Sequence, residues 1–286
     1  MTRTKLIEPR IIAKPWGRTI LPQPFAQSQP EPIGEIAFDP PTDVSEILVK
    51  FLFTSEALSV QVHPGTHTTP ARTMPVQGKE ECWYVIDAEP GAHILLGLNE
   101  PVDEPTLRQA ALDGTIELLL HSYSVNVGDF IHIPPGTIHA IGAGISIVEI
   151  QQNSDATYRL FDYGRPRELH LEAALRCADR AAVEPAKLIR HTPAAPCTLL
   201  SGTAFQVDLY NGPAAPDIVQ RYRHAPLILI PLSGSCNVDG TCLEPGSCGI
   251  VTHIADIRFE AGSQGLLAQP RTTQPRSAPE IEATCT

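Results

Sequence analysis

Alternating apolar and polar residues predict a chain built mainly from short β-strands. Between residues 58 and 63, apolar Leu and Val alternate with polar Ser, Gln and His, which is the period of a strand with one buried face. Gln61 and His63 therefore share one face of that strand. Further strands are expected at residues 82–86, 92–97, 130–133 and 145–151.

Three parts of the first 185 residues depart from the strand period. Between Glu104 and Leu120, two short stripes of helical period lie on either side of Asp113-Gly114, and Arg167–Asp179 carries a third. These segments predict short helices that cap a β-barrel. The first 45 residues, which contain Lys14-Pro15-Trp16-Gly17 and a Pro/Gln-rich segment, are expected to be irregular.

After about Pro185 the chain turns to short apolar runs separated by Pro and Gly. Strands are expected at residues 203–210, 226–232, 235–238, 249–251, 257–259 and 266–268, with a loose tail over 277–286. The segment Leu243–Val251 has the Gly-turn-strand pattern of the segment that begins at Gly128, without its terminal histidine. We therefore expect two units, residues 1–185 with the functional site and residues 186–286 as a second, degenerate β-barrel without metal ligands.

Composition narrows the classes of partner. The 286 residues include 28 Pro and 20 Gly against 6% aromatics, which favours many turns and short strands over a helical bundle. A net charge of -11 argues against nucleic acid and anionic membranes, since both require a basic surface. Seven cysteines without paired zinc-finger spacing indicate a reducing compartment. Charged residues interrupt the first dozen positions, so no secretory signal is expected and a cytoplasmic location is predicted.

Four polar residues on the predicted strands form a candidate site for a divalent metal ion. The segment Gly128–His139 places His139 after a Pro-Pro-Gly turn, and Gln61, His63 and Glu81 lie upstream. Two imidazole nitrogens, a carboxylate and an amide oxygen make a mixed N/O set with a net charge of about -1, which suits Zn²⁺, with Mn²⁺, Fe²⁺ or Co²⁺ as possible replacements. Cys82 follows Glu81 directly, so it is expected on the opposite face, as a small buried apolar residue.

Lys79 and Arg159 are candidates for binding an anionic substrate in this acidic protein. Lys79 lies two residues before Glu81 and would share its face on a regular strand, although most lysines are simply on the surface. Arg159 offers a planar guanidinium to a phosphate or an enediolate oxygen. An ordinary salt bridge from Arg159 to Asp155 or Asp162 is the alternative.

Five motifs stand out over about residues 10–180: Lys14–Gly17, Ser59–Pro64, Gly78–Tyr84, Gly128–His139 and Gln151–Arg159. Together they resemble the class I, metal-dependent mannose-6-phosphate isomerases of the cupin superfamily, in their short bacterial form. Beyond residue 190 the likeness is weak. The resemblance implies a cupin (jelly-roll) barrel and one Zn²⁺ per chain held by Gln61, His63, Glu81 and His139. It also implies that Arg159 lies in the active site and that Lys79 faces the substrate.

The hypothesis that follows is an aldose-ketose isomerase that interconverts mannose 6-phosphate and fructose 6-phosphate. This reaction moves a proton between C1 and C2 through an enediolate and needs no nicotinamide or flavin. The base could be a metal-site histidine, a carboxylate or neutral Lys79. A non-enzymatic sugar-binding cupin and an Fe-dependent cupin dioxygenase remain as alternatives. The expected partner is a small phosphosugar, and the protein is expected to be a monomer or homodimer.

Overall fold

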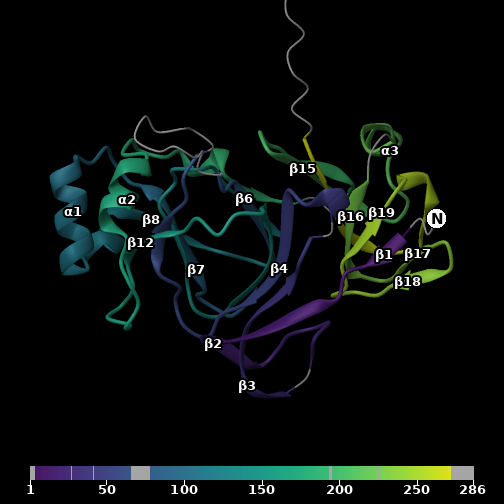
Figure 1. The fold of residues 1–286 in the computed structure, drawn as a ribbon, viewed down its shortest axis with the longest axis horizontal. Helices are drawn as coiled ribbons and strands as arrows, with labels where there is room; N and C mark the ends of the chain where they lie inside the picture. Colours follow the sequence, from purple (N-terminus) through teal and green to yellow (C-terminus); the bar gives the residue numbers. More distant parts are fainter. Residues whose placement is uncertain are drawn as a thin grey trace, which may run out of the picture.

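The computed structural model describes residues 4–26, 28–40, 42–65, 78–192, 195–223 and 226–271. These residues form an elongated, mainly β molecule in which two groups of strands lie side by side (Figure 1). The first group of strands contains the candidate site and consists of two antiparallel sheets, and short helices cover its outer end. The second group of strands contains β1 (Thr4–Leu6) and the strands that follow residue 195.

The two sheets of the first group face one another across a shared apolar core. The seven-stranded sheet has the order β13-β9-β6-β11-β4-β3-β2, and the five-stranded sheet has the order β12-β5-β10-β7-β8. Trp83, Ile131 and Ile147 from the first sheet pack with Leu96 and Ile141 from the second. The strands are β2 (Pro9–Ile20), β3 (Ser28–Phe38), β4 (Ile47–Phe53), β6 (Glu81–Ala88), β9 (Asp129–Ile133), β11 (Ile145–Gln152) and β13 (Ile189–His191) in the larger sheet, and β5 (Val60–Val62), β7 (His93–Leu98), β8 (Leu120–Ser124), β10 (His139–Ile141) and β12 (Tyr158–Phe161) in the smaller.

Helices cover the outer face of the five-stranded sheet, as the helical period predicted. The helix α1 (Glu104–Asp113) begins where Asp103 accepts a hydrogen bond from the backbone N–H of Thr106, and it ends at Gly114, whose φ of 80° suits glycine. The short helix η2 (Thr115–Leu119) follows, and α2 (Leu171–Cys177) packs beside α1. Their buried residues form a core with Val60 and Val62, which lie on either side of Gln61 in β5.

The second group of strands is also layered. Its six-stranded sheet, in the order β1-β19-β16-β21-β15-β14, packs on the outer face of the seven-stranded sheet, so both groups share one apolar core. A three-stranded sheet and α3 cover its other face through a separate core. The elements are β1 (Thr4–Leu6), β14 (Cys197–Ser201), β15 (Phe205–Asn211), α3 (Pro216–Arg221), β16 (Leu227–Ser233), β17 (Cys236–Val238), β18 (Thr241–Leu243), β19 (Gly249–Val251), β20 (Ile257–Phe259) and β21 (Gln264–Pro270), with the short helices η1 (Thr42–Val44), η3 (Pro185–Lys187) and η4 (Ile254–Asp256) in the connections of the chain.

The expectation that the first 45 residues are irregular was wrong, because β2 and β3 form a long hairpin there. β2 is the edge strand of its sheet, where prolines remove no hydrogen bond that an inner strand would need. The register of the hairpin is interrupted between Ala13 and Arg18. This irregularity brings Trp16 into the core between the two sheets and lets Gly17 approach the Ile33 backbone so closely that a Cβ would lie 2.4 Å from its carbonyl carbon.

Two strands cross the expected division at residue 185. β1 pairs with β19 in the six-stranded sheet, and β13 pairs with β9 in the seven-stranded sheet. The chain therefore passes from the second group to the first after β1 and returns to the second group after β13. The first of these crossings can be followed along the N-terminal strands (Figure 1). The division into residues 1–185 and 186–286 stays a prediction, and the tail expected over residues 277–286 lies outside the described residues.

Two further observations concern the whole described chain. None of its helices has the length and apolar content that crossing a membrane would require. The six cysteines that lie in the described ranges are all free thiols. Cys82 is buried, and burial raises its pKa well above the ordinary value, as the prediction of a small apolar residue implies.

Candidate active site and metal centre

Three cross-strand neighbours bring part of the predicted site together on the five-stranded sheet. His139 on β10 lies opposite Gln61 on β5, and Gln61 lies opposite Arg159 on β12. Residues directly opposite one another in an antiparallel ladder share a face of the sheet, so these three side chains form a row. The row is held in place because the backbone N–H of Gly136, in the Pro-Pro-Gly turn before His139, donates to the His63 carbonyl oxygen at 2.8 Å.

Glu81 completes the cluster from the opposite, seven-stranded sheet. It begins β6, and one potential ligand atom from each of His63, Glu81 and His139 lies within 4.8 Å of the others. All three residues are at most 1% exposed. The structure thus brings together three of the four predicted ligands from two sheets that face one another, and Gln61 lies beside His139.

Each histidine presents its Nε2 atom to the cluster. His63 Nδ1 lies 3.0 Å from the Ala156 carbonyl oxygen, and His139 Nδ1 lies 2.9 Å from the Thr137 carbonyl oxygen. A carbonyl oxygen only accepts hydrogen bonds, so both Nδ1 atoms carry the proton and donate it. Each Nε2 atom then carries a lone pair that can bind a metal ion, and the backbone carbonyls fix the orientation of the rings.

The cluster contains more hydrogen-bond acceptors than donors. His63 Nε2 lies 3.2 Å from Glu81 Oε2, and His139 Nε2 lies 3.5 Å from Glu81 Oε1. The Lys79 ammonium donates to Glu81 Oε2 at 2.5 Å and to His63 Nε2 at 3.2 Å, but Glu81 Oε1 is buried and has no hydrogen-bond partner among the described residues. An unpaired buried carboxylate oxygen beside imidazole nitrogens needs a cation, so the donor set fits a divalent metal ion.

The pKa values of these groups favour metal binding at neutral pH. Burial alone would raise the pKa of Glu81, but Lys79, His63 and His139 overcome it and hold the pKa well below the ordinary range. Burial and the neighbouring His63 lower the pKa of His139 to about 3. Glu81 is therefore ionised and His139 neutral, which are the protonation states that metal ligands require.

The Gln61 side chain lies beside the cluster, and its amide nitrogen is oriented toward His139. Gln61 Nε2 is 3.3 Å from His139 Nε2, and Gln61 Oε1 accepts from the Ser59 hydroxyl at 3.2 Å. The oxygen and nitrogen of an amide occupy nearly the same positions after a half-turn, and serine can accept as well as donate. That half-turn would place Gln61 Oε1 toward the cluster and let Gln61 Nε2 donate to Ser59.

In the described structure Arg159 forms neither of the salt bridges that were its alternative role, to Asp155 or to Asp162. Asp162 instead accepts hydrogen bonds from Arg165 and Arg167, the latter through both its oxygens at 2.6 Å. Arg159 Nε is buried and has no hydrogen-bond partner among the described residues. A guanidinium that is aligned with Gln61 and His139 and has no acidic partner in the described part of the chain keeps its charge available for a ligand.

A chain of buried and half-buried charged side chains between the sheets was missed in the sequence. Lys50 on β4 lies opposite Glu149 on β11, and its ammonium is 3.5 Å from Glu149 and 3.7 Å from Glu35. Burial lowers the pKa of Lys50, but Glu149, Glu35 and Glu81 more than offset this and raise it. The signal in the sequence was a lone charge in each of two apolar strands, Ile-Leu-Val-Lys-Phe-Leu-Phe and Ile-Ser-Ile-Val-Glu-Ile.

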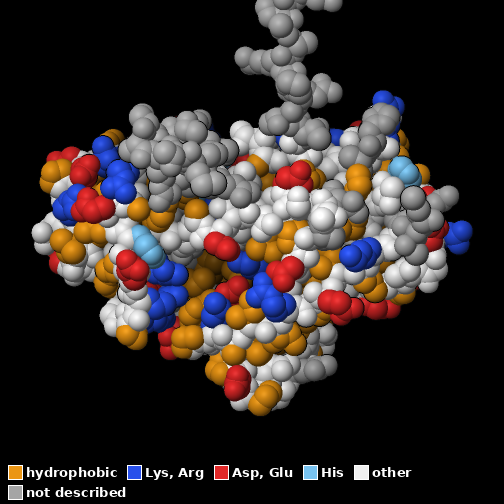
Figure 2. Space-filling view, in the orientation of Figure 1, with side chains coloured by type: hydrophobic (Ala, Val, Ile, Leu, Met, Phe, Trp, Pro, Cys, Tyr) orange, Lys and Arg blue, Asp and Glu red, His pale blue; other side chains and the backbone are white. Residues whose placement is uncertain are grey.

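The Lys50–Glu149 pair lies on the same face of the sheet as Glu81. Glu149 is opposite Trp83 and Gln151 is opposite Glu81, so strand alternation directs all four side chains to the inner face. Gln151 is fully buried, and its Oε1 atom has no hydrogen-bond partner in the described structure. Side chains of both charges also surround a hollow over the opening between the two sheets (Figure 2).

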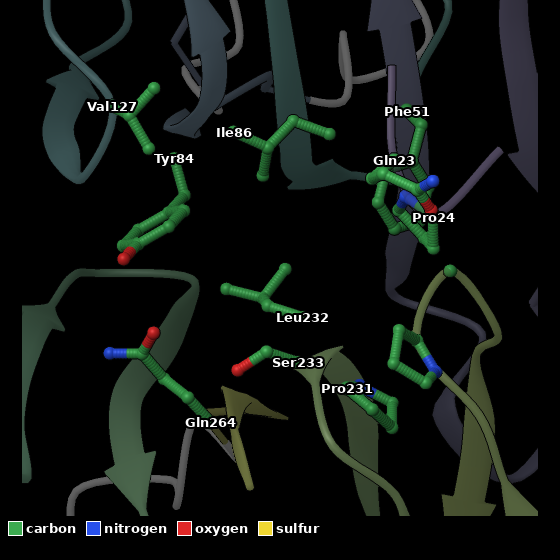
Figure 3. A pocket seen from close by; sticks show the side chains of 12 residues that line it. Gln23, Pro24, Phe51, Tyr84, Ile86, Val127, Pro231, Leu232, Ser233 and Gln264 are labelled. Carbon is green, nitrogen blue, oxygen red and sulfur yellow. The ribbon is translucent and has the colours of Figure 1, made fainter. Parts of the chain in front are cut away.

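A separate cavity of about 380 Å³ lies between the two groups of strands and is unsuited to an anionic sugar. Tyr84, Ile86 and Phe51 from the outer face of the seven-stranded sheet meet Leu232 and other side chains of the second group across it (Figure 3). Strand alternation puts Tyr84 on the face opposite Glu81, so the sheet separates this cavity from the cluster. None of the described lysines, arginines or histidines lines it.

Comparisons with known proteins extend the motif resemblance. No family model matches the chain. The chain is 39% identical over 151 residues to the mannose-6-phosphate isomerase ManA of Bacillus subtilis, covering 51% of this chain and 48% of that protein. It is 43% identical over 140 residues to the mannose-6-phosphate isomerase of Streptococcus mutans, covering 47% and 44%. The chain thus spans about half the length of the curated relatives that it matches.

Solved structures are similar over nearly the whole chain. The crystal structure of the mannose 6-phosphate isomerase from Bacillus subtilis aligns with a TM-score of 0.74 and 25% identity, covering 94% of this chain and all of that one. A mutant of phosphomannose isomerase from Salmonella typhimurium aligns with a TM-score of 0.71 at 14% identity, which is a likeness of fold. The prediction of a mainly β, cupin-like chain is confirmed, and so is its resemblance to the mannose-6-phosphate isomerases.

Proposed function

We propose that this protein is a metal-dependent aldose-ketose isomerase that interconverts D-mannose 6-phosphate and D-fructose 6-phosphate. The observation that carries the proposal is the buried cluster of His63, Glu81 and His139 with two cationic side chains, Lys79 and Arg159, beside it. The relatives described above are isomerases of this phosphosugar by name, and none of them supports the oxygenase or the non-enzymatic alternative.

Zinc is the metal ion that we propose for the cluster, one per chain. His63 Nε2, His139 Nε2 and Glu81 would hold it, and Gln61 would contribute its amide oxygen after the half-turn described above. Nitrogen and oxygen donors of this kind are the usual ligands of Zn²⁺. When bound, such an ion polarises the oxygens of a sugar as a Lewis acid and generates no change of redox state.

Lys79 and Arg159 would bind and stabilise negative charge. The reaction moves the proton on C2 of the aldose to C1, while the carbonyl group passes from C1 to C2. Negative charge develops on the two sugar oxygens in between, and the Arg159 guanidinium, which has no acidic partner among the residues described, would stabilise it. With His63 Nε2 bound to the metal ion, that lone pair would no longer accept from the Lys79 ammonium, which would keep its contact with Glu81 and donate to the substrate through another of its three N–H groups.

A coupled assay for fructose 6-phosphate, run with metal analysis on the same purified sample, tests the proposal. The wild-type protein is expected to contain about one zinc ion per chain and to isomerise mannose 6-phosphate. The variant His139→Ala is expected to lose metal and activity together, because one of three buried ligands is gone. The control His93→Ala removes an exposed imidazole from a neighbouring strand and should keep both. Full activity in a metal-free His139→Ala protein would refute the assignment.

Location and assembly are proposed on narrower grounds. The free thiols of the described cysteines agree with a reducing compartment such as the cytoplasm. We keep the expectation of a monomer or homodimer, which size-exclusion chromatography with light scattering would decide.

A further inference from the structure

The acidic residue between the two site residues Lys79 and Glu81 points away from the site. Glu80 is 2% exposed, and its carboxylate lies on the outer face of the seven-stranded sheet, against the second group of strands. His132 on β9 is 2.9 Å from Glu80 Oε1. The remaining donors come from the turn between β14 and β15, more than 120 residues further along the chain.

The turn encloses the Glu80 carboxylate closely. Glu80 Oε2 accepts hydrogen bonds from the backbone N–H of Thr203 at 3.0 Å, from the Thr203 hydroxyl at 2.8 Å and from the backbone N–H of Ala204 at 2.9 Å. Gly202 allows this approach, because a Cβ at that position would lie 2.6 Å from Glu80 Oε1. Hydrogen bonds to a charged acceptor are shorter and about twice as strong as neutral ones, so this is a firm attachment.

The backbone of the same residue is also fixed. The N–H of Glu80 donates to Gln152 Oε1 at 2.8 Å, and the N–H of Gln152 donates to the Glu80 carbonyl oxygen at 2.9 Å. Side chain and backbone together therefore hold Glu80 from three directions. Because Lys79 and Glu81 are its immediate neighbours, any rotation or shift of Glu80 moves the Lys79 ammonium and the Glu81 carboxylate.

We infer that Glu80 is a positioning residue through which the turn 201–204 of the second group of strands sets the positions of Lys79 and Glu81 in the site. This inference rests on the proposed function, and it gives the second group a role in catalysis beyond burying apolar surface. The residue acts from behind the sheet and does not touch the substrate. A displacement of about 1 Å at a reacting group can lower a rate by about 100-fold, so a small shift is enough.

Variants on both sides of the contact test the inference. Glu80→Gln keeps the shape but removes the charge, and Gly202→Ala presses on the carboxylate without changing the strand of the site. Leu200→Ala is the matched control, since it removes apolar packing from the same shared core and leaves the carboxylate untouched. For each protein, kcat, KM, the melting temperature and the visible spectrum with Co²⁺ in place of zinc are measured.

The expected result is a kcat lowered by about 10- to 100-fold in Glu80→Gln and in Gly202→Ala, with an altered Co²⁺ spectrum and a smaller change of KM. Leu200→Ala should keep kcat and the spectrum while melting at a lower temperature. The inference is overturned if both test variants match the wild type, or if kcat falls in all three in proportion to the melting temperature. Should Glu80→Gln fail to fold, Gly202→Ala decides.

The readouts separate this inference from the proposed function. If the wild-type protein shows no isomerase activity, the proposed function fails, and the Co²⁺ spectra of the same variants still decide whether Glu80 positions Glu81. An unchanged spectrum in Gly202→Ala then overturns the inference, and a changed one supports it.

Discussion

Zinc is expected to stabilise the folded protein by a measurable amount, because one buried carboxylate oxygen has no hydrogen-bond partner within the described structure. Glu81 is fully buried and ionised, and its Oε1 atom faces His139 Nε2 at 3.5 Å with no proton between them. The unfolded chain does not hold these donors together, so a metal ion binds the native state preferentially. Such binding shifts the folding equilibrium by mass action.

The size of the effect follows from the affinity and the length of the chain. At free zinc of about 1,000 times Kd, the stabilisation is about 4 kcal/mol. Unfolding entropy of about 2.1 cal/mol/K per residue amounts to about 0.6 kcal/mol/K for the 286 residues. The melting temperature should therefore rise by about 7 °C when zinc is added to protein that was treated with a chelator.

Differential scanning calorimetry of chelated and zinc-loaded protein measures this shift. In His139→Ala the shift should shrink to less than about 2 °C, whereas the exposed His93→Ala control should keep the wild-type value. A wild-type melting temperature that does not respond to zinc would refute the reasoning from Glu81. An equal shift in His139→Ala would show that zinc binds elsewhere.

Three further predictions address single groups. Arg159→Ala should retain zinc and lose about 100-fold or more in kcat, as for a charge-stabilising donor; unchanged kinetics in the coupled assay would remove it from the site. In metal-free protein the pKa of His139 is lowered, so below about pH 6.5 its imidazole binds a proton in the unfolded chain but stays neutral in the native state. The free energy of unfolding should therefore fall toward pH 5, by at most about 1.4 kcal/mol per pH unit. The free energy of unfolding, measured with urea at several pH values, should depend less steeply on pH in His139→Gln than in the wild type. An equal pH dependence in both proteins would contradict the assignment. Tyr222→Phe removes a hydroxyl that donates to the buried Asp208 at 2.8 Å, and it should cost about 1–3 kcal/mol in urea unfolding. Activity should be unaffected there, since Tyr222 lies in the separate core of the second group.

Much of this protein could be predicted from local sequence. Period-two alternation before residue 185, and short apolar runs bounded by Pro and Gly after it, predicted most strands after residue 45. Asp113-Gly114 marked the end of α1, because side-chain period and turn chemistry act over a few residues. Alternation also put Lys79 on the side of Glu81, where its ammonium now binds that carboxylate. The first 45 residues escaped prediction because prolines in an edge strand and its neighbour obscure the strand period.

Convergence of the site is a property of the tertiary structure. His63 and His139 belong to one sheet and Glu81 to another, and only the packing of the two sheets brings their donor atoms within 4.8 Å. Likewise, no local pattern links Glu80 to Thr203, because the contact depends on how the second group of strands docks. The sequence determined which residues alternate inward and which chemistry they offer. Distances between residues far apart in the chain were decided by sheet pairing and by the shared apolar core.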